Sequence, residues 1–436
     1  MNAKPLLSLL SGLGFLALAA LDTTAMEHYY LTDLGPINSA SQIARSINRN
    51  GLVLIGHRLD DPLGGSLLFD GTNRYDLWDL VGREKQFEAF DLNDEGIIVG
   101  RAVFGTERHA VALIKARPED RFGTVMVELD QTTNSVAISI NNDNQIIGWR
   151  TGVDKYLVAF RGSLTGAQLN LPENFFPERI GPGGHIVGSV LPVGGGAAHA
   201  AVYWFGGSIQ DLGGLPDPLK GSRGLAWNLT PRLGSAVGGG GVRLAPTFVG
   251  LSESDTRYKH AFLWDVDSWQ DLDVVPHPER EGSTEARGIN SRGEIVGIVQ
   301  PLGSHACIFR GGVVINLNFA FPKGIFIHGM HGWTLQTADA INDLGQIAGW
   351  GNKSASDVRA YMITPVRPFI ERGGSSVSIS WPALLEGFSL ESTDSLSATA
   401  SWQPVTNAPT QRGTFKTITL EVEPSDRARF FRLVGQ

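Results

Sequence analysis

Residues 286–297 read Ala286-Arg-Gly-Ile-Asn290-Ser-Arg-Gly-Glu-Ile-Val-Gly297, and this stretch decides the fold of the chain. It is one copy of a repeated phrase, Ala-x-x-Ile-Asn-x-x-Gly-x-Ile-x-Gly, which also stands at 89–100, 137–148 and 338–349. A short phrase that returns at intervals of roughly 45 to 50 residues is typical of an array of small β-units. The repeat therefore predicts a repeat architecture built from strands.

The Asn and the first Gly of the phrase predict the tip of a β-hairpin. Asn at the start of a type I turn bonds its side chain to the backbone ahead of it, and Gly suits the end of that turn. We expect this structural role, and no calcium loop, because each tip holds too few carboxylates for calcium. The residues concerned are Asn48, Asn93, Asn141, Asn290 and Asn342. Two copies are degenerate: Gly181 replaces Asn within 180–188, and the stretch 226–238 is barely recognisable.

Two companion phrases recur in fixed order around the first. One is a short strand that ends in an acidic or amide residue followed by Leu, as in Asp211-Leu212, and the other is an apolar strand that often opens with His-Ala. Because these histidines recur at one structural position, we interpret them as packing or hydrogen-bonding residues. They are His109, His199, His260 and His305.

Four short strands per unit at this spacing predict an all-β chain that forms a β-propeller of about seven blades, with six to eight as the range. The last apolar strand, 359–363, has no following Asp-Leu strand, whereas the first Asp-Leu strand, 29–35, has no preceding apolar strand. We expect these two strands to pair, because the pairing closes the ring and removes two exposed edges.

The sequence changes character beyond the repeats. Residues 375–436 alternate apolar and polar positions between turn residues and predict a small β-sandwich, with Trp381, Trp402 and Phe431 in its core. The predicted organisation is a signal peptide at 1–25, the propeller at 28–365, a linker at 366–374 and the sandwich module at 375–436.

The N-terminus predicts export. Lys4 precedes an apolar run from about Leu6 to Leu21, followed by small residues, which is the pattern of a secretory signal with cleavage after Ala19 or Ala25. The rest of the sequence contains no run of about 18 apolar residues, so we expect no transmembrane anchor beyond the signal peptide. We expect a secreted protein, at the cell exterior, on the cell surface or in the periplasm.

Composition bears on partners and on redox chemistry. A net charge of −8 without any Lys/Arg cluster makes nucleic acid an unexpected partner. The single cysteine, Cys307, cannot form an intramolecular disulfide, and its strand-like neighbours predict a buried thiol.

The repeats resemble those of the extracellular HAF-repeat family of bacterial proteins. The resemblance rests on Asp-Leu-Gly at 33–35, Ala-x-x-Ile-Asn-Asp-x-Gly-Gln-Ile-x-Gly at 338–349 and His-Ala-Phe-Leu-Trp at 260–264, and it covers 28–365. It implies secretion and a propeller-like fold, and it implies no reaction. The tail is similar to a small immunoglobulin- or fibronectin-like module of secreted bacterial proteins, through Ser-Trp-Pro (380–382), Gly-Phe-x-Leu-Glu-Ser (387–392), Trp-x-Pro-Val (402–405) and Phe-Phe-Arg-Leu (430–433).

Insertions between repeats are the natural places for a ligand site, because they fall in loops. Two insertions, 274–287 and 319–333, carry charged residues and histidines. We take the following as candidate ligand-binding residues: His277, Glu281, Glu285, Arg287, His328 and His331. No catalytic residue, metal or cofactor is assigned, since two histidines without a third ligand are weak grounds for a metal site.

Three functions remain open. The leading hypothesis is a non-catalytic scaffold that binds an extracellular glycan or protein, because every recurrent phrase has a folding explanation. The alternatives are a polysaccharide hydrolase or lyase, which would pair Glu281 or Glu285 with His328 or His331, and a structural surface or adhesion component.

Overall fold

The computed structural model describes most of the chain. The described residues are 27–37, 42–57, 65–130, 134–151, 157–191, 198–203, 207–213, 221–229, 234–238, 241–245, 248–254, 259–265, 268–272, 283–300, 304–320, 324–354, 356–373, 375–383, 385, 387–395, 400–412, 415–421 and 429–435. The predicted signal peptide lies outside them. The chain divides into a larger unit, Thr32–Phe319 with Met330–Met362, and a smaller unit that holds the remainder.

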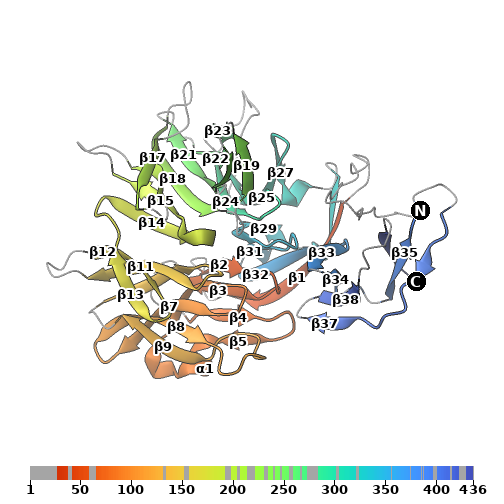
Figure 1. Cartoon of the computed structure of the whole chain (residues 1–436), viewed down its shortest axis with the longest axis horizontal. Helices are drawn as coiled ribbons and strands as arrows, with labels where there is room; N and C mark the ends of the chain where they lie inside the picture. The colour runs from red at the N-terminus through yellow and green to blue at the C-terminus, as the bar shows by residue number, and fades with distance from the viewer. Residues whose placement is uncertain are drawn as a thin grey trace. The chain divides into compact units, whose positions relative to one another are not determined.

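The larger unit is built from four-stranded antiparallel sheets whose strands follow one another in chain order (Figure 1). The first is β2–β5 (Gln42–Ile47, Val53–His57, Leu67–Phe69, Arg74–Asp76), and the second is β6–β9 (Glu88–Leu92, Ile98–Phe104, Glu107–Ile114, Val125–Asp130). The third is β10–β13 (Val136–Ile140, Gln145–Thr151, Leu157–Ser163, Gly166–Asn170), and the fourth is β14–β17 (Phe175–Ile180, Ile186–Val190, His199–Tyr203, Ile209–Gly213). A further such sheet is β24–β27 (Ser283–Ile289, Ile295–Gln300, His305–Arg310, Val313–Asn316).

The fifth sheet is interrupted. Its strands are β18 (Gly221–Leu229), β21 (Phe248–Ser254), β22 (Lys259–Asp265) and β23 (Ser268–Asp271), and the hairpin β19–β20 (Gly234–Gly238, Gly241–Ala245) is inserted between the first two. Ala226 pairs with Gly250, as Ala137 pairs with Gly148 in a regular copy. The degenerate copy predicted at 226–238 therefore closes at Gly250 and not at Gly238, because the hairpin β19–β20 is inserted before its closing glycine.

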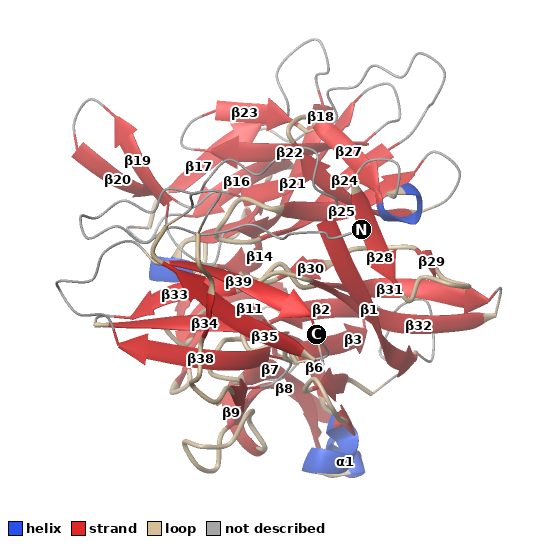
Figure 2. Cartoon of the chain, turned by 90° about the vertical axis from the view of Figure 1, so that its right-hand side faces the viewer, coloured by secondary structure: helices blue, strands red, loops and turns tan. Residues whose placement is uncertain are grey.

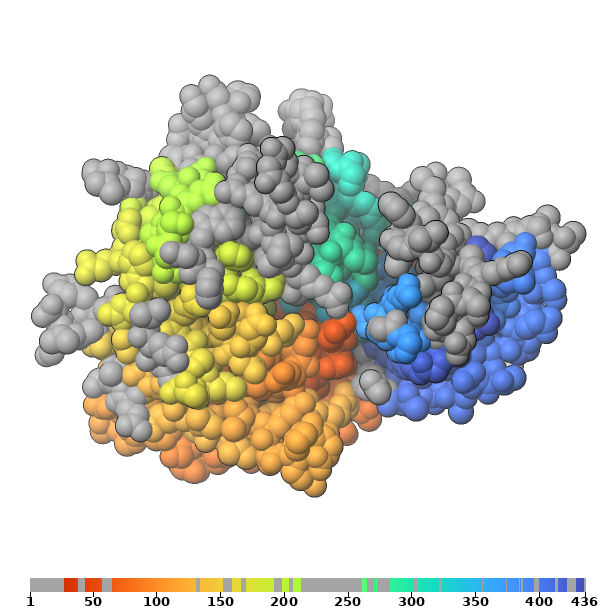
Figure 3. All heavy atoms as spheres, viewed as in Figure 1, coloured from red at the N-terminus to blue at the C-terminus, as the bar shows by residue number. Residues whose placement is uncertain are grey.

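The sheets pack on one another through apolar faces. One core cluster joins the first sheet to the second through Leu54 and Ile98, and another joins the second to the third through Val99 and Ile146. Figure 3 shows these sheets, in orange and yellow, in direct side-by-side contact. A cluster with Ala360 and Met362 joins the last sheet back to the first, so the packing runs round a closed ring.

The ring is closed by the pairing that the sequence predicts. The last sheet has the order β28-β1-β32-β31-β29, with β30 also on β31. Its strands are β28 (Ile325–His328), β1 (Glu27–Pro36), β32 (Asp357–Pro365), β31 (Ile347–Ser354), β29 (Thr334–Leu335) and β30 (Ala340–Ile341). Arg359 Nη1 lies 2.8 Å from Asp33 Oδ2, and Ile37 N–H donates to Val358 O at 3.0 Å. The chain is thus an all-β propeller; the total of about seven blades concerns the whole chain and stays a prediction.

The Asn turns form as expected and also make bonds that the sequence did not reveal. In each turn the Asn Oδ1 accepts backbone N–H groups ahead of it, as Asn342 does from Leu344 and Gln346. The same amide then donates to the turn of the next sheet. Nδ2 of Asn48 donates to Asn93 O at 3.1 Å, and Nδ2 of Asn342 donates to Asn48 O at 2.9 Å. The equivalent bonds run from Asn93 to Asn141, from Asn141 to Gly181 and from Asn290 to Asn342.

The His-Ala and Asp-Leu phrases meet across adjacent strands of one sheet. His199 Nδ1 lies 3.0 Å from Asp211 Oδ1, and His305 Nδ1 lies 2.9 Å from Asn316 Nδ2. His109 makes the same kind of contact with Glu128. These histidines therefore have hydrogen-bonding roles, while the His260 side chain lies outside the described part of the structure.

The smaller unit contains the predicted β-sandwich (Figure 2). One sheet is β33-β34-β38-β37 (Phe369–Gly373, Ser376–Pro382, Phe415–Glu421, Thr410–Arg412), and the other is β36-β35-β39 (Gln403–Pro404, Phe388–Thr393, Phe430–Gly435). Trp381 and Phe431 lie in the shared core as predicted, whereas Trp402 is half-buried and stacks under Arg432 at 4.4 Å. Most of the expected linker is instead the strand β33, because Phe369 is buried and pairs with Ser380.

Candidate functional site

A β-bulge interrupts the innermost strand of every four-stranded sheet in the ring. The register shifts lie between Ala44 and Ser46, Ala89 and Asp91, Ala137 and Ser139, Pro177 and Arg179, Ala226 and Asn228, and Ala286 and Gly288. A bulge leaves one residue unpaired and re-aims the side chains beside it. Four residues that follow such bulges contact one another: Ser46, Asp91, Ser139 and Arg179.

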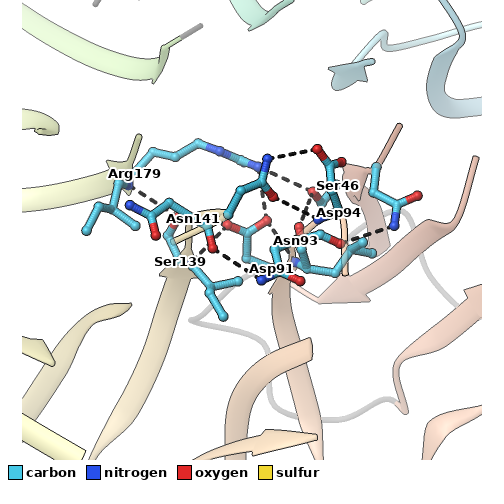
Figure 4. Close-up of polar contacts among 12 residues, drawn as sticks. Ser46, Asp91, Asn93, Asp94, Ser139, Asn141 and Arg179 are labelled. Carbon is cyan, nitrogen blue, oxygen red and sulfur yellow. Dashed lines mark hydrogen bonds and ion pairs between the residues drawn. The ribbon is translucent and has the colours of Figure 1, made fainter. Parts of the chain in front are cut away.

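Arg179, just after the bulge of the fourth sheet, reaches across the axis of the ring (Figure 4). Its Nη2 lies 3.0 Å from Asp91 Oδ1 of the second sheet and 3.3 Å from Ser46 Oγ of the first. These partners belong to sheets that are not neighbours of the fourth, so the side chain must span the middle of the ring. Within the described residues, the side-chain hydrogen bonds of Arg179 all use Nη2, which leaves the N–H groups of Nε and Nη1 available to a ligand.

Asp91 anchors Arg179 through a buried network. The Asp91 side chain is 1% exposed, against 27% for Arg179. Its Oδ2 accepts from Ser139 Oγ at 2.7 Å and from Ile140 N–H at 3.1 Å. A buried carboxylate needs such partners to offset its lost hydration, so Asp91 holds both the arginine and the third sheet in place.

A cavity of about 410 Å³ opens beside this network at the Asn-turn end of the ring. We call it the vestibule. Its walls are the turns at Asn48, Asn93, Asn141 and Asn342, and Arg179 lies in its lining with Ile180 and Gly181. The charged residues of its lining are Arg49, Asp94, Asp143, Arg179 and Asp343. A cavity of this size lies in the range of small-ligand sites.

Glu178 occupies the bulge immediately before Arg179. Part of its side chain reaches solvent, while the protein groups around its carboxyl group withdraw that group from water and raise its pKa from 4.5 to about 7; Arg45 of the first sheet lowers that pKa only in part. A carboxyl group with this pKa can exchange protons near neutral pH.

Glu178→Gln should change how stability depends on pH. Because folding raises the pKa of Glu178, the folded chain binds more protons than the unfolded chain between pH 4.5 and about 7, and stability falls as pH rises through this window. The variant should therefore melt at a higher temperature than the parent at about pH 8 and at a similar temperature near pH 4.5. Thermal melts across this range test it; parallel curves for the two proteins would contradict it.

The structure uses Glu285 and Arg287 internally. Glu285 is buried, and Arg287 forms ion pairs with Glu285 at 2.9 Å and with Asp339 at 2.8 Å. Burial disfavours the charge on Arg287, but Asp339 and Glu285 outweigh it and raise its pKa. The Glu285 carboxylate and the Arg287 guanidinium are thus engaged in ion pairs, and neither residue lines the vestibule. His277 and Glu281 lie outside the described residues.

The two histidines of the second insertion belong to different units of the chain. His328 belongs to the smaller unit, where its Nε2 lies 3.0 Å from His28 Nδ1 and its ring stacks on Tyr30. Burial and the charge of His28 lower the pKa of His328. His331 is exposed and belongs to the larger unit. Among the described residues no group of three or more His, Cys, Asp or Glu side chains could hold a metal ion.

Sequence reasoning missed Arg179 and Asp91, although one signal pointed to them. The fourth copy is degenerate: Pro-Glu-Arg-Ile-Gly at 177–181 stands where a regular copy has Ala-x-x-Ile-Asn. The lost Asn marks this copy as irregular, and the charged residues Glu178 and Arg179 stand just before it. The side chains at this position in other copies, such as Ser46 and Ser139, are too short to cross the axis.

The chain has only distant similarity to known proteins. No protein-family model and no curated protein matches the chain. Similar solved structures include a puromycin-hydrolyzing peptidase from Mycobacterium tuberculosis (12% identity, TM-score 0.42, 81% of this chain and 58% of that chain) and TolB from Acinetobacter baumannii (8%, 0.35, 56% and 62%). An alpha-L-arabinofuranosidase from Podospora anserina is similar at 10% identity and a TM-score of 0.30, over 80% of this chain and 98% of that one.

This chain spans less than two thirds of the length of the first two of these structures. These similarities carry no conclusion about the activity of this chain. In the described part of the chain, no helix combines the length and apolar character needed to cross a membrane.

Proposed function

We propose that this protein is a secreted, non-catalytic scaffold that binds an extracellular glycan or protein, and that the vestibule is where the ligand's polar groups enter. The observation that carries the proposal is the position of Arg179, which crosses the axis and keeps the N–H groups of Nε and Nη1 free of other described residues at the cavity. Guanidinium donors beside carboxylate acceptors suit hydroxyl-rich ligands, because each hydroxyl both donates and accepts.

Secretion belongs to the same proposal. It is supported by the N-terminal sequence and by the resemblance of the repeats to the HAF-repeat family. The immunoglobulin- or fibronectin-like character of the C-terminal sandwich is likewise a proposal, supported by its four sequence phrases.

Arg179→Gln should weaken ligand binding at least tenfold, because Gln is shorter and cannot bring donors to the axis. Arg117→Gln is the matched control, since Arg117 is exposed, pairs with Asp120 and does not line the vestibule. Binding would be measured on a glycan array and by calorimetry with the ligands it identifies. Equal loss in both variants, or no loss in either, would contradict the assignment of the site.

A second candidate function is catalysis on an extracellular polysaccharide. The specific observation in its favour is Glu178, whose pKa of about 7 suits a general acid or base. Turnover of a polysaccharide by the parent protein that Glu178→Gln abolishes would establish this function and replace the non-catalytic one.

A further inference from the structure

The charge of the vestibule narrows the class of ligand. Of the charged residues in its described lining, two are arginines and three are aspartates, and Asp91 behind Arg179 adds a fourth carboxylate, for a net charge of −2. Asp143 is exposed, while Asp94 and Asp343 are half-buried. A negatively charged ligand group therefore meets a described lining that holds more carboxylates than guanidinium groups.

Arg179 does not make the vestibule favour anions, because its positive charge is already neutralised by the carboxylate of Asp91. Its Nη2 is 3.0 Å from the buried carboxylate of Asp91, so an incoming anion meets an ion pair rather than a bare cation. The groups of Arg179 that remain available are the N–H donors of Nε and Nη1. Such donors bind a neutral oxygen, such as a hydroxyl, a ring oxygen or an amide carbonyl, without removing Asp91.

The aspartates of the vestibule lining offer the complementary hydrogen-bond acceptors. Asp94 Oδ1 accepts the backbone N–H of Arg49 at 2.9 Å, and Asp143 Oδ2 accepts that of Gly183 at 3.2 Å. Each carboxylate has about four lone-pair sites, so these turn contacts leave acceptor capacity for ligand hydroxyls. The lining thus holds both guanidinium donors and carboxylate acceptors, which together suit the hydroxyls of a sugar ring.

We infer that the vestibule takes neutral sugar residues and discriminates against uronic acids. This inference rests on the proposed function, since it names the ligand class of the same cavity. It makes Arg179 the donor for a neutral oxygen, and Asp94, Asp143 and Asp343 the residues that repel acids and accept hydroxyls.

The experiment compares matched trisaccharides that differ only in charge: glucose with glucuronate, galactose with galacturonate, and mannose with mannuronate. By calorimetry at low salt, at least one neutral trisaccharide should bind, and its acidic partner should bind at least tenfold more weakly. The gap should shrink at about 1 M salt, because the Debye length falls from about 10 Å at 0.1 M to about 3 Å.

The double variant Asp143→Asn/Asp343→Asn supplies the structural control. It keeps an oxygen acceptor at each position and removes two charges, so the ratio of the affinity for the neutral trisaccharide to the affinity for its acidic partner should fall at least threefold. Tighter binding of the acid by the parent protein, with loss in Arg179→Gln, would overturn the inference and leave the proposed function standing. If no trisaccharide of either charge binds, glycan binding in the vestibule is wrong and the inference falls with it.

Discussion

Gly297→Ala should leave the protein unable to form a stable ring. A Cβ atom built on Gly297 would lie 1.9 Å from the carbonyl oxygen of Glu285 in the paired inner strand. Real Cβ atoms essentially never approach a neighbour so closely, and the neighbour here is backbone that cannot rotate away. The variant should accumulate as insoluble protein or lose its cooperative thermal transition. Circular dichroism melts of the soluble fraction are the measurement.

The same contact recurs in four other copies of the repeated phrase. The closing glycines of four other copies face an inner-strand carbonyl at 1.9 or 2.0 Å; they are Gly100, Gly148, Gly188 and Gly349. Gly373→Ala is the control, because its nearest neighbour would be the Ser376 hydroxyl at 3.8 Å. A soluble Gly297→Ala protein that melts within a few degrees of the control would show that the strands can separate at little cost.

Asp91→Ala should be the most damaging substitution in the polar network. It leaves the Arg179 guanidinium without its counter-ion and removes the acceptor of Ser139 Oγ and of the Ile140 N–H. Breaking a buried ion pair by removing one partner typically costs 3–5 kcal/mol. Because Arg179 is partly exposed and can reach water, we expect about 3 kcal/mol in the free energy of unfolding. Chemical denaturation gives this quantity.

The double variant Asp91→Ala/Arg179→Ala separates the ion pair from the rest of the network. If the unpaired charge dominates, the double variant should be more stable than Asp91→Ala alone, because no uncompensated guanidinium remains. Additive losses in the two single variants would mean that Asp91 acts through Ser139 and Ile140 instead.

The sequence predicted the features that depend on residues close together in the chain. The Asn turns follow from the capacity of Asn Oδ1 to accept N–H groups two and four residues ahead, as Asn48 does from Asn50 and Leu52. Ring closure through Asp33 and Arg359 could also be predicted, since an Asp-Leu strand lacked a partner at one end of the array and an apolar strand lacked one at the other. The burial of Cys307 followed from its strand-like neighbours.

The candidate site was not predictable in the same way. The insertions drew attention to Glu285 and Arg287, but their charges are satisfied by each other and by Asp339 from the next sheet. The composition of a loop cannot reveal such a partner, because the partner lies 52 residues away. The sequence shows the break in the repeat at Gly181. It does not show that the side chain of Arg179, two residues earlier, reaches Asp91 and Ser46.

The sequence by itself therefore determined the repeating unit, the hairpin turns and the closure of the ring. The turns and units depend on hydrogen bonds between residues that are close together in the chain. The closure follows from counting the strands that lack a partner at the two ends of the array. Only the tertiary structure decided that Arg179 meets Asp91 and Ser46, which lie 88 and 133 residues away. The physical reason is that the axis of a ring is the one place where non-neighbouring sheets approach one another, and a long side chain there acquires partners that no spacing along the chain encodes.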